Sequence, residues 1–90
     1  EKVKEVWEGA FKGAKALTYV ELGNQLQSLE DEAFACCPNL KAITLPSSLR
    51  RIGKDVFRNT PVTVKCEKDS SVYTYCMENG IPVEISGLVN

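Results

Sequence analysis

The apolar residues of this chain recur at a fixed interval of 23 residues. The interval is clearest in the phenylalanines Phe11, Phe34 and Phe57. Other apolar positions keep the same interval: Val6, Leu29 and Ile52 before the phenylalanine, and Leu17 with Leu40, Val20 with Ile43, Leu22 with Leu45, and Leu26 with Leu49 after it. A fixed period of this length is typical of a solenoid, in which each unit buries its apolar side chains only against its neighbours. The pattern therefore predicts stacked coils.

Apolar and polar residues alternate within each repeat where a strand is expected. The expected strands run over Leu17–Leu22, Leu40–Leu45 and Pro61–Cys66. In the second strand, Ala42 and Thr44 face one side, and Ile43 and Leu45 face the other. The inward residues of the third strand are Val62, Val64 and Cys66. This strand matches the register of the others if two residues are deleted after Asn59.

A turn, a second extended piece and a helical turn are expected to complete each repeat. Turn residues follow the first two strands, as Gly23-Asn24-Gln25 and Pro46-Ser47-Ser48. The shorter extended pieces are Leu26–Leu29 and Leu49–Ile52. Each Ala-Phe or Val-Phe pair then follows an acidic residue, Glu8, Asp31 or Asp55. Because carboxylates stabilise the positive end of a helix, these residues favour a short helical turn.

The period stops after Cys66, and the rest of the chain has another pattern. Ser70 or Ser71 suits the N-cap of a helix, and Gly80 suits the residue just beyond its end. Val72 and Cys76 lie on one face of this helix, together with Tyr75 and Asn79. The predicted organisation is repeats over residues 1–66, divided as 6–28, 29–51 and 52–66, and a carboxyl-terminal cap over 67–90.

Charge and hydropathy narrow the classes of partner. The net charge is −1, and the basic residues are spread through the chain, so there is no electrostatic footprint for nucleic acid. The densest basic group, Arg50, Arg51 and Lys54, is interpreted as a solvated edge of one repeat. No apolar run approaches the roughly 20 residues that span a bilayer. We therefore expect neither a nucleic-acid partner nor membrane insertion of this chain.

The cysteines form no common metal motif. They are Cys36, Cys37, Cys66 and Cys76, and the chain has no Cys-x-x-Cys and no histidine. We expect Cys36 and Cys37 to be small side chains in the core. Cys66 and Cys76 have the spacing of a local disulfide, with two free thiols as the alternative. No metal or other cofactor is expected.

No catalytic residue is expected either. A catalytic site needs a nucleophile, a base and an orienting group within reach of one another, and the cysteines have no predicted base beside them. The run Glu30-Asp31-Glu32 is interpreted as a solvated face, and the glycines are too scattered for a phosphate-binding loop. The chain is therefore predicted to be non-enzymatic.

The second repeat resembles the BspA-like leucine-rich repeat. The residues that carry the resemblance are the Ala33-Phe34 pair, Cys37, Leu40, the run Ile43-Thr44-Leu45-Pro46, and the closing Ile52-Gly53. The resemblance covers about residues 6–85 and is partial in the third repeat. Ala14 and Thr60 stand at the cysteine position in the other repeats, so Cys37 is interpreted as a small core residue rather than a required ligand.

Two departures from leucine-rich repeats are visible. Gln25 and Ser48 stand where ordinary leucine-rich repeats carry asparagine or cysteine, so the usual asparagine ladder is not indicated. Trp7 and Glu30 stand where the family prefers glycine, whereas Gly53 follows the preference.

The resemblance implies an α/β fold. We expect a right-handed leucine-rich-repeat solenoid with short parallel strands and short helical turns, in about two and a half 23-residue coils. A short helix and a last strand are expected to close it at the carboxyl end, as a terminal unit must hide the last coil. At the amino end, Glu1–Glu5 is too short to cover Phe11 and Leu17. Either further repeats precede this chain, which we favour, or the chain associates through its open first coil.

The stacked strands predict a binding face. Two outward rows align across the repeats, Tyr19 with Ala42 and Thr63, and Glu21 with Thr44 and Lys65. Solenoids use such extended faces for protein contact, and tyrosine is enriched at interfaces. The resemblance implies a bacterial or protist cell-surface or secreted protein used in adhesion or host contact, with a host or matrix protein as partner. The alternative is a structural spacer or cap of a larger surface protein, without a ligand of its own.

Overall fold

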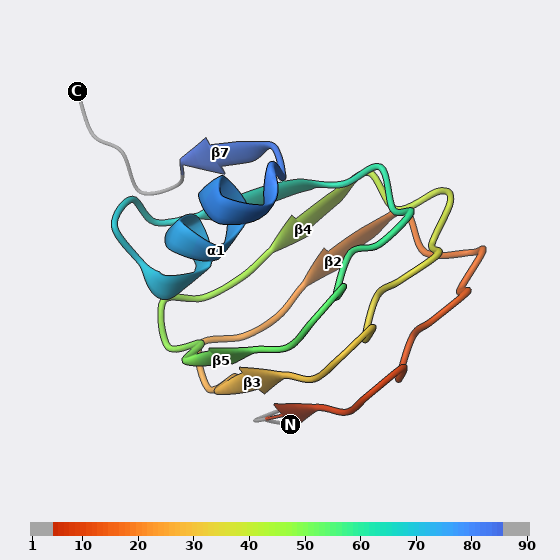
Figure 1. Cartoon of the computed structure of the whole chain (residues 1–90), viewed down its shortest axis with the longest axis horizontal. Helices are drawn as coiled ribbons and strands as arrows, with labels where there is room; N and C mark the ends of the chain where they lie inside the picture. The colour runs from red at the N-terminus through yellow and green to blue at the C-terminus, as the bar shows by residue number, and fades with distance from the viewer. Residues whose placement is uncertain (1–4, 86–90) are drawn as a thin grey trace.

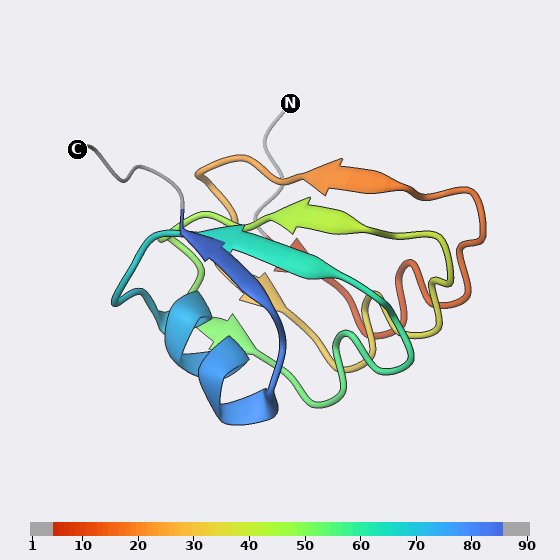
Figure 2. The ribbon, with the colours of Figure 1, turned by 90° about the horizontal axis from the view of Figure 1, so that it is seen from above.

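The structure, a computed structural model, describes residues 5–85. Its elements are β1 (Glu5–Val6), β2 (Tyr19–Glu21), β3 (Ser28–Leu29), β4 (Ala42–Thr44), β5 (Arg51–Ile52), β6 (Thr63–Cys66), α1 (Ser71–Asn79) and β7 (Val83–Ile85). The chain passes alternately through two sheets (Figures 1 and 2). Sheet A has the order β1-β3-β5, and sheet B has the order β2-β4-β6-β7. Every strand pair is parallel, which makes this an α/β arrangement.

Consecutive repeats lie beside each other in both sheets. Tyr19 pairs with Ala42, a separation of 23 residues, and Ala42 pairs with Thr63, a separation of 21. The predicted deletion of two residues after Asn59 is therefore confirmed. Each observed strand lies within the extended segment that the alternation predicted, and is shorter than it.

The inward residues of both sheets form one apolar cluster. Ile43 and Leu45 are buried, whereas Ala42 and Thr44 on the opposite face are half-buried, as predicted. The inward residues Val62, Val64 and Cys66 are buried as well. The other side of the core comes from Leu26, Leu29 and Leu49 near sheet A.

The recurring phenylalanines form a stacked column within this cluster. The ring centroids of Phe11 and Phe34 are 5.1 Å apart with an angle of 8° between the planes, and those of Phe34 and Phe57 are 6.0 Å apart with an angle of 16°. Phe34 is fully buried and Phe57 is 6% exposed, but Phe11 is 42% exposed. The period of 23 therefore places each ring on its neighbour, and the first ring has a neighbour on one side among the described residues.

The segments predicted as short helical turns are runs of consecutive turns instead. In the second repeat, the N–H groups of Ala33 and Ala35 donate to the carbonyls three residues earlier, at 3.2 and 3.1 Å. A helix would bond each N–H four residues back. The prediction of helical turns after Glu8, Asp31 and Asp55 was therefore wrong, and α1 is the one helix in residues 5–85.

The remaining N–H groups of these turns explain the difference, because they bond to the next repeat. Alternate N–H groups of the first repeat, on Gly9, Phe11 and Gly13, donate to carbonyls of the second at 2.8–2.9 Å. The matching groups of the second repeat, on Glu32, Phe34 and Cys36, donate to Lys54, Val56 and Arg58 of the third at 2.7–3.0 Å. Hydrogen bonds between repeats thus replace those that a helix would make within one repeat.

Left-handed backbone conformations recur with the same period and produce this alternation. The first set is Gly9, Glu32 and Asp55, and the second is Gly13, Cys36 and Asn59, with φ values from 55° to 74°. Residues with side chains rarely adopt this region, at a cost of about 1–2 kcal/mol each for most of them. The bonds between repeats hold the backbone there in the second and third repeats, where no glycine is present.

Gly53 lies where two repeats approach most closely. A Cβ atom at this position would lie 2.6 Å from the Asp31 nitrogen and 2.9 Å from the Glu30 carbonyl carbon. We expect Gly53→Ala to lower the free energy of unfolding by about 1–3 kcal/mol, because the backbone of a neighbouring repeat must shift. The control is Gly23→Ala, where an added Cβ meets nothing within 4 Å. Urea denaturation of both variants measures the difference, and equal losses would contradict the steric explanation.

The carboxyl-terminal part contains the predicted helix. The Ser70 side chain accepts a hydrogen bond from the N–H of Tyr73 at 3.1 Å, and Gly80 follows with a left-handed φ of 67°. Both predicted helix ends are confirmed. Val72 and Cys76 are buried against the core, and β7 joins sheet B beside β6. Of the predicted domain ranges, residues 1–4 and 86–90 lie outside the described part of the chain.

Candidate functional site

The six residues predicted as a binding surface lie on the outward side of three neighbouring strands of sheet B. We call this surface the sheet B face; its residues are Tyr19, Glu21, Ala42, Thr44, Thr63 and Lys65. The two rows align as expected, with Ala42 between Tyr19 and Thr63, and Thr44 between Glu21 and Lys65. Tyr19 and Glu21 are exposed, and the other four are half-buried. The structure thus brings all six residues together.

Side-chain contacts hold the aromatic ring of the sheet B face in place. The Tyr19 hydroxyl lies 3.0 Å from the Thr44 hydroxyl, within hydrogen-bond distance. The Lys65 ammonium group lies 5.7 Å from the centre of the Tyr19 ring, which is the geometry of a cation–π contact. Tyr19 nevertheless remains 48% exposed. The surface therefore presents an aromatic side chain whose position is already restricted.

The sequence analysis missed one residue beside this surface. β7 pairs with β6, and Glu84 stands opposite Lys65 at the end of the row that begins with Glu21. The alternation of Val83, Glu84 and Ile85 is a signal for a strand, but the sequence does not say which edge the strand joins. A hollow of about 560 Å³ adjoins the sheet B face at the ends of β2 and β4, with Glu21 and Thr44 in its lining.

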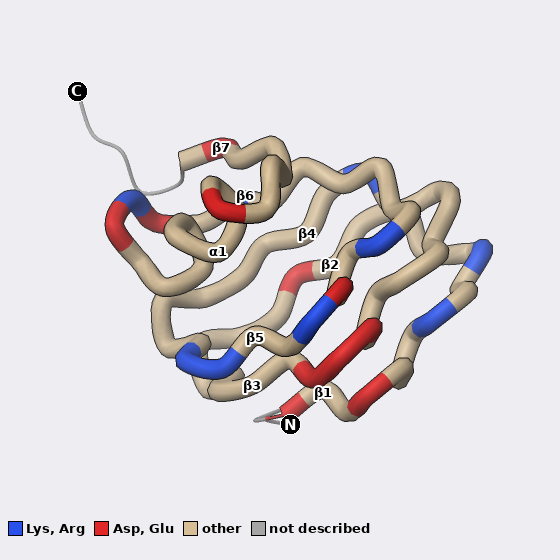
Figure 3. The backbone as a smooth tube through the Cα atoms, viewed as in Figure 1, with Lys and Arg blue, Asp and Glu red and all other residues tan. Residues whose placement is uncertain are grey.

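The acidic run Glu30-Asp31-Glu32 links adjacent repeats. Glu30 pairs with Arg51 at 3.2 Å, and Glu32 pairs with Lys12 at 3.1 Å. Asp31 accepts a hydrogen bond from the backbone N–H of Lys54 at 2.9 Å. Charges of both signs therefore lie side by side along the turns (Figure 3). Exposed pairs of this kind contribute about 0–1 kcal/mol each.

The position of Cys37 forms a further link between repeats. The Cys37 thiol donates to the carbonyl of Phe11 at 3.2 Å, and the Thr60 hydroxyl, one repeat later, donates to the carbonyl of Phe34 at 2.6 Å. The Ser48 hydroxyl makes a similar bond to the Leu26 carbonyl at 2.7 Å. Small polar side chains thus satisfy backbone carbonyls of the preceding repeat, and this role accounts for Cys37 without a ligand.

All four cysteines are free thiols. Of the two alternatives for Cys66 and Cys76, the structure has the free thiols, both buried. Burial raises the pKa of Cys76 to about 12, and the nearby Cys66 adds to the rise. Burial also raises the pKa of Cys66, against a smaller opposing effect of a hydrogen bond with Ser70. Because the thiolate is the reactive form, these thiols are poor nucleophiles.

Metal-binding and membrane-spanning features were searched over the same part of the chain. No group of three or more acidic, cysteine or histidine side chains in residues 5–85 has the arrangement of a metal site. No helix described there has the length and apolar character needed to cross a bilayer.

Comparisons with known proteins agree with the repeat pattern. Residues 1–80 match the family model described as the BspA type leucine rich repeat region, in 6 copies. No curated protein matches the chain, and no solved structure matches it.

Proposed function

The chain belongs to the BspA-type leucine-rich repeat family, and on this basis we propose that it is a non-enzymatic protein–protein interaction module. The observation that carries the proposal is the sheet B face. Its two rows come from three consecutive repeats in one register, and its exposed Tyr19 is held by Thr44 and Lys65. Rigid, exposed aromatic side chains contribute much of the free energy at protein interfaces.

We further propose that the repeats form a right-handed solenoid and that residues 67–90 are its carboxyl-terminal cap. The parallel pairing of consecutive repeats supports the solenoid. The packing of α1 on the core supports the cap, because Val72 and Cys76 are fully buried beyond the third repeat. Terminal units of repeat proteins cover the apolar side of the last coil in this way.

We also propose that further repeats precede this chain in its full protein. Leu17, Val20 and Leu22 of the first repeat are only half-buried, whereas the matching residues of the second repeat are buried. Another coil stacked on the first would bury these residues and the outer side of Phe11. The family supports a location at the cell surface or outside the cell, with adhesion or host contact as the role.

Binding assays with purified extracellular-matrix proteins test the interaction proposal. We expect one of them to bind the 90-residue chain and the double change Tyr19→Ala with Lys65→Ala to weaken binding by about tenfold or more, as for central interface residues. The matched control is Trp7→Ala with Lys68→Ala, which removes an exposed aromatic ring and a lysine outside the sheet B face. Surface plasmon resonance measures the affinities.

The outcomes separate the candidate functions. Equal affinities of the two double variants would place the binding site elsewhere. If the chain bound none of the proteins, the alternative of a structural spacer would be favoured.

A further inference from the structure

Sheet A ends in a row of unpaired backbone groups. Asp55, Phe57 and Asn59 occupy the repeat positions from which Glu32, Phe34 and Cys36 donate to the next repeat. Their own N–H groups donate to no acceptor among the described residues. We call β5 and the turns up to Asn59 the free edge of sheet A.

The carbonyl groups along the free edge are unpaired as well. Leu29 and Gln27 accept hydrogen bonds from N–H groups of the following repeat. The matching carbonyls of the third repeat, on Ile52 and Arg50, accept none within residues 5–85. β5 has β3 as its sole partner strand there, so its other side is open. The free edge therefore offers two acceptors followed by three donors, in the pattern that each repeat presents to the next.

One of these donors is in a costly position. Phe57 is 6% exposed, yet its N–H makes no hydrogen bond in the described structure. Most buried backbone N–H groups have a partner, and leaving one unpaired costs about 1–3 kcal/mol. A ligand that supplies carbonyl oxygens along this edge would remove that cost.

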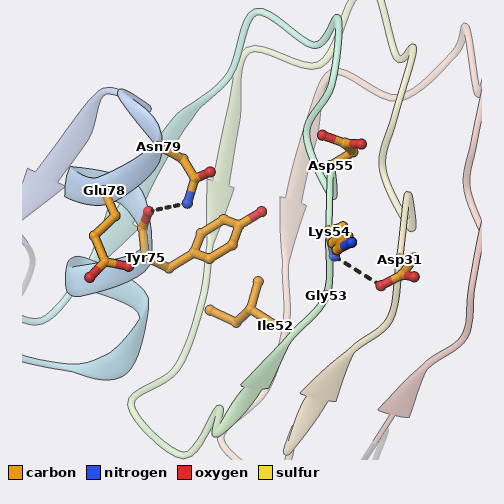
Figure 4. Close-up of a pocket in the computed structure, with 8 residues that line it drawn as sticks. All are labelled: Asp31, Ile52, Gly53, Lys54, Asp55, Tyr75, Glu78 and Asn79. Carbon is orange, nitrogen blue, oxygen red and sulfur yellow. Dashed lines mark hydrogen bonds between the residues drawn. The ribbon is translucent and has the colours of Figure 1, made fainter.

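A groove runs between the free edge and α1. Its largest hollow has a volume of about 520 Å³, and a second of about 310 Å³ adjoins it on the side of Arg50. Tyr75, Glu78 and Asn79 reach the groove from α1, opposite Ile52–Asp55 (Figure 4). The unpaired backbone groups of the third repeat therefore lie beside open space.

The charges around the groove indicate what kind of side chain it takes. Asp31, Asp55 and Glu78 line the largest hollow against a single cation, Lys54. None of these three carboxylates is in an ion pair within the described residues. The half-buried ring of Tyr75 stands among them and offers a face to a cation. A lysine or arginine side chain suits this environment.

We propose that the free edge of sheet A binds an extended, basic peptide segment of a partner protein by strand addition. The segment lies parallel to β5, and its N–H groups donate to the carbonyls of Arg50 and Ile52. Its carbonyls accept from the N–H groups of Asp55, Phe57 and Asn59. Main-chain bonds of this kind provide affinity, and alternate side chains provide specificity. This site is separate from the sheet B face and does not depend on it.

Amide hydrogen exchange followed by NMR tests the edge. The probe is a heptapeptide of alternating valine and lysine with blocked ends. In the free chain, the amides of Asp55, Phe57 and Asn59 should exchange roughly tenfold faster than those of Glu32, Phe34 and Cys36, which are hydrogen-bonded. The peptide should slow the first set and leave the second unchanged. No binding at millimolar peptide, or binding without protection of these amides, would overturn the proposal.

Methylated peptides separate strand addition from simple charge attraction. One version carries N-methyl groups on its valines and the other on its lysines, so each lacks the N–H groups of one strand edge. Exactly one version should bind about tenfold more weakly, because only one edge of the segment faces β5. Equal affinities of the two versions would overturn strand addition.

Two protein variants test the charge preference. Asp55→Asn should weaken peptide binding by about threefold to tenfold, and asparagine tolerates the left-handed backbone at this position. Glu84→Gln removes a carboxylate from sheet B and should leave binding unchanged. Equal effects of the two changes, or equal binding of a valine–glutamate peptide, would contradict the basic specificity. Tyr19→Ala should not affect the peptide, which keeps this site distinct from the sheet B face.

Discussion

Replacing Phe34 with alanine is expected to lower the free energy of unfolding by about 3–5 kcal/mol. The side chain is fully buried, and its ring stacks on Phe11 on one side and on Phe57 on the other. Its removal leaves a cavity between three consecutive repeats, whose backbones are held apart by the hydrogen bonds between them and cannot close it. Urea or thermal denaturation followed by circular dichroism measures the loss.

Phe11→Ala is the matched comparison. Phe11 occupies the same position one repeat earlier but is 42% exposed and stacks on a single ring. Its loss should be clearly smaller, at about 1–2 kcal/mol, because less apolar area leaves water. Phe34→Leu keeps most of the buried volume and should cost less than Phe34→Ala. Equal losses for the two alanine variants would show that the first coil is covered as fully as the second.

The second large effect is expected at alkaline pH. Burial raises the pKa of Cys76 from 9.0 to about 12, so the folded chain binds this proton more tightly than the unfolded chain does. The resulting stability is fully present below about pH 9 and is lost as the pH rises toward 12. Each pH unit between the two pKa values is worth about 1.4 kcal/mol, so the total loss is on the order of 4 kcal/mol. Urea denaturation at a series of pH values, with a reducing agent present, measures it.

Cys76→Ala isolates the contribution of this thiol. The variant lacks the titrating group, so its stability should fall less steeply between pH 9 and 12 than that of the parent chain. Cys66 and Tyr75, whose pKa values burial also raises, are present in both proteins and largely cancel in the comparison. Parallel stability curves for the two proteins would contradict the expectation.

The strands and their register could be predicted from the sequence. The alternation around Ile43 indicated which residues face the core, since a strand turns successive side chains to opposite faces. The spacing also indicated the shortened third repeat, seen in the pairing of Ala42 with Thr63. These properties depend on the order of residues along one repeat and on the equality of neighbouring repeats.

The turns could not be predicted in this way. The acidic residues and the Ala33-Phe34 pair are compatible with a helix, yet alternate N–H groups bond to the next repeat. The left-handed backbone of Glu32 and Cys36 follows from these bonds and has no signal in residue type. Which acceptor an N–H finds depends on the repeat stacked beside it, and local propensity does not contain that information.

The candidate sites divide in the same manner. The rows of the sheet B face follow from the period of 23 residues, so Tyr19 and Lys65 could be named from the sequence. Their contact with each other, and the place of Glu84 beside them, depend on side-chain directions and on the edge that β7 joins. The free edge of sheet A was not predicted, because it is defined by hydrogen bonds that the third repeat does not make.

The sequence by itself thus determined the repeat, the inward residues and the pairing of consecutive strands, because periodic burial of apolar side chains is written along the chain. The tertiary structure alone decided how the turns between the sheets are bonded and where backbone groups are left without partners. These properties depend on the positions of groups about one repeat apart, and only the stacking of the repeats brings those groups together.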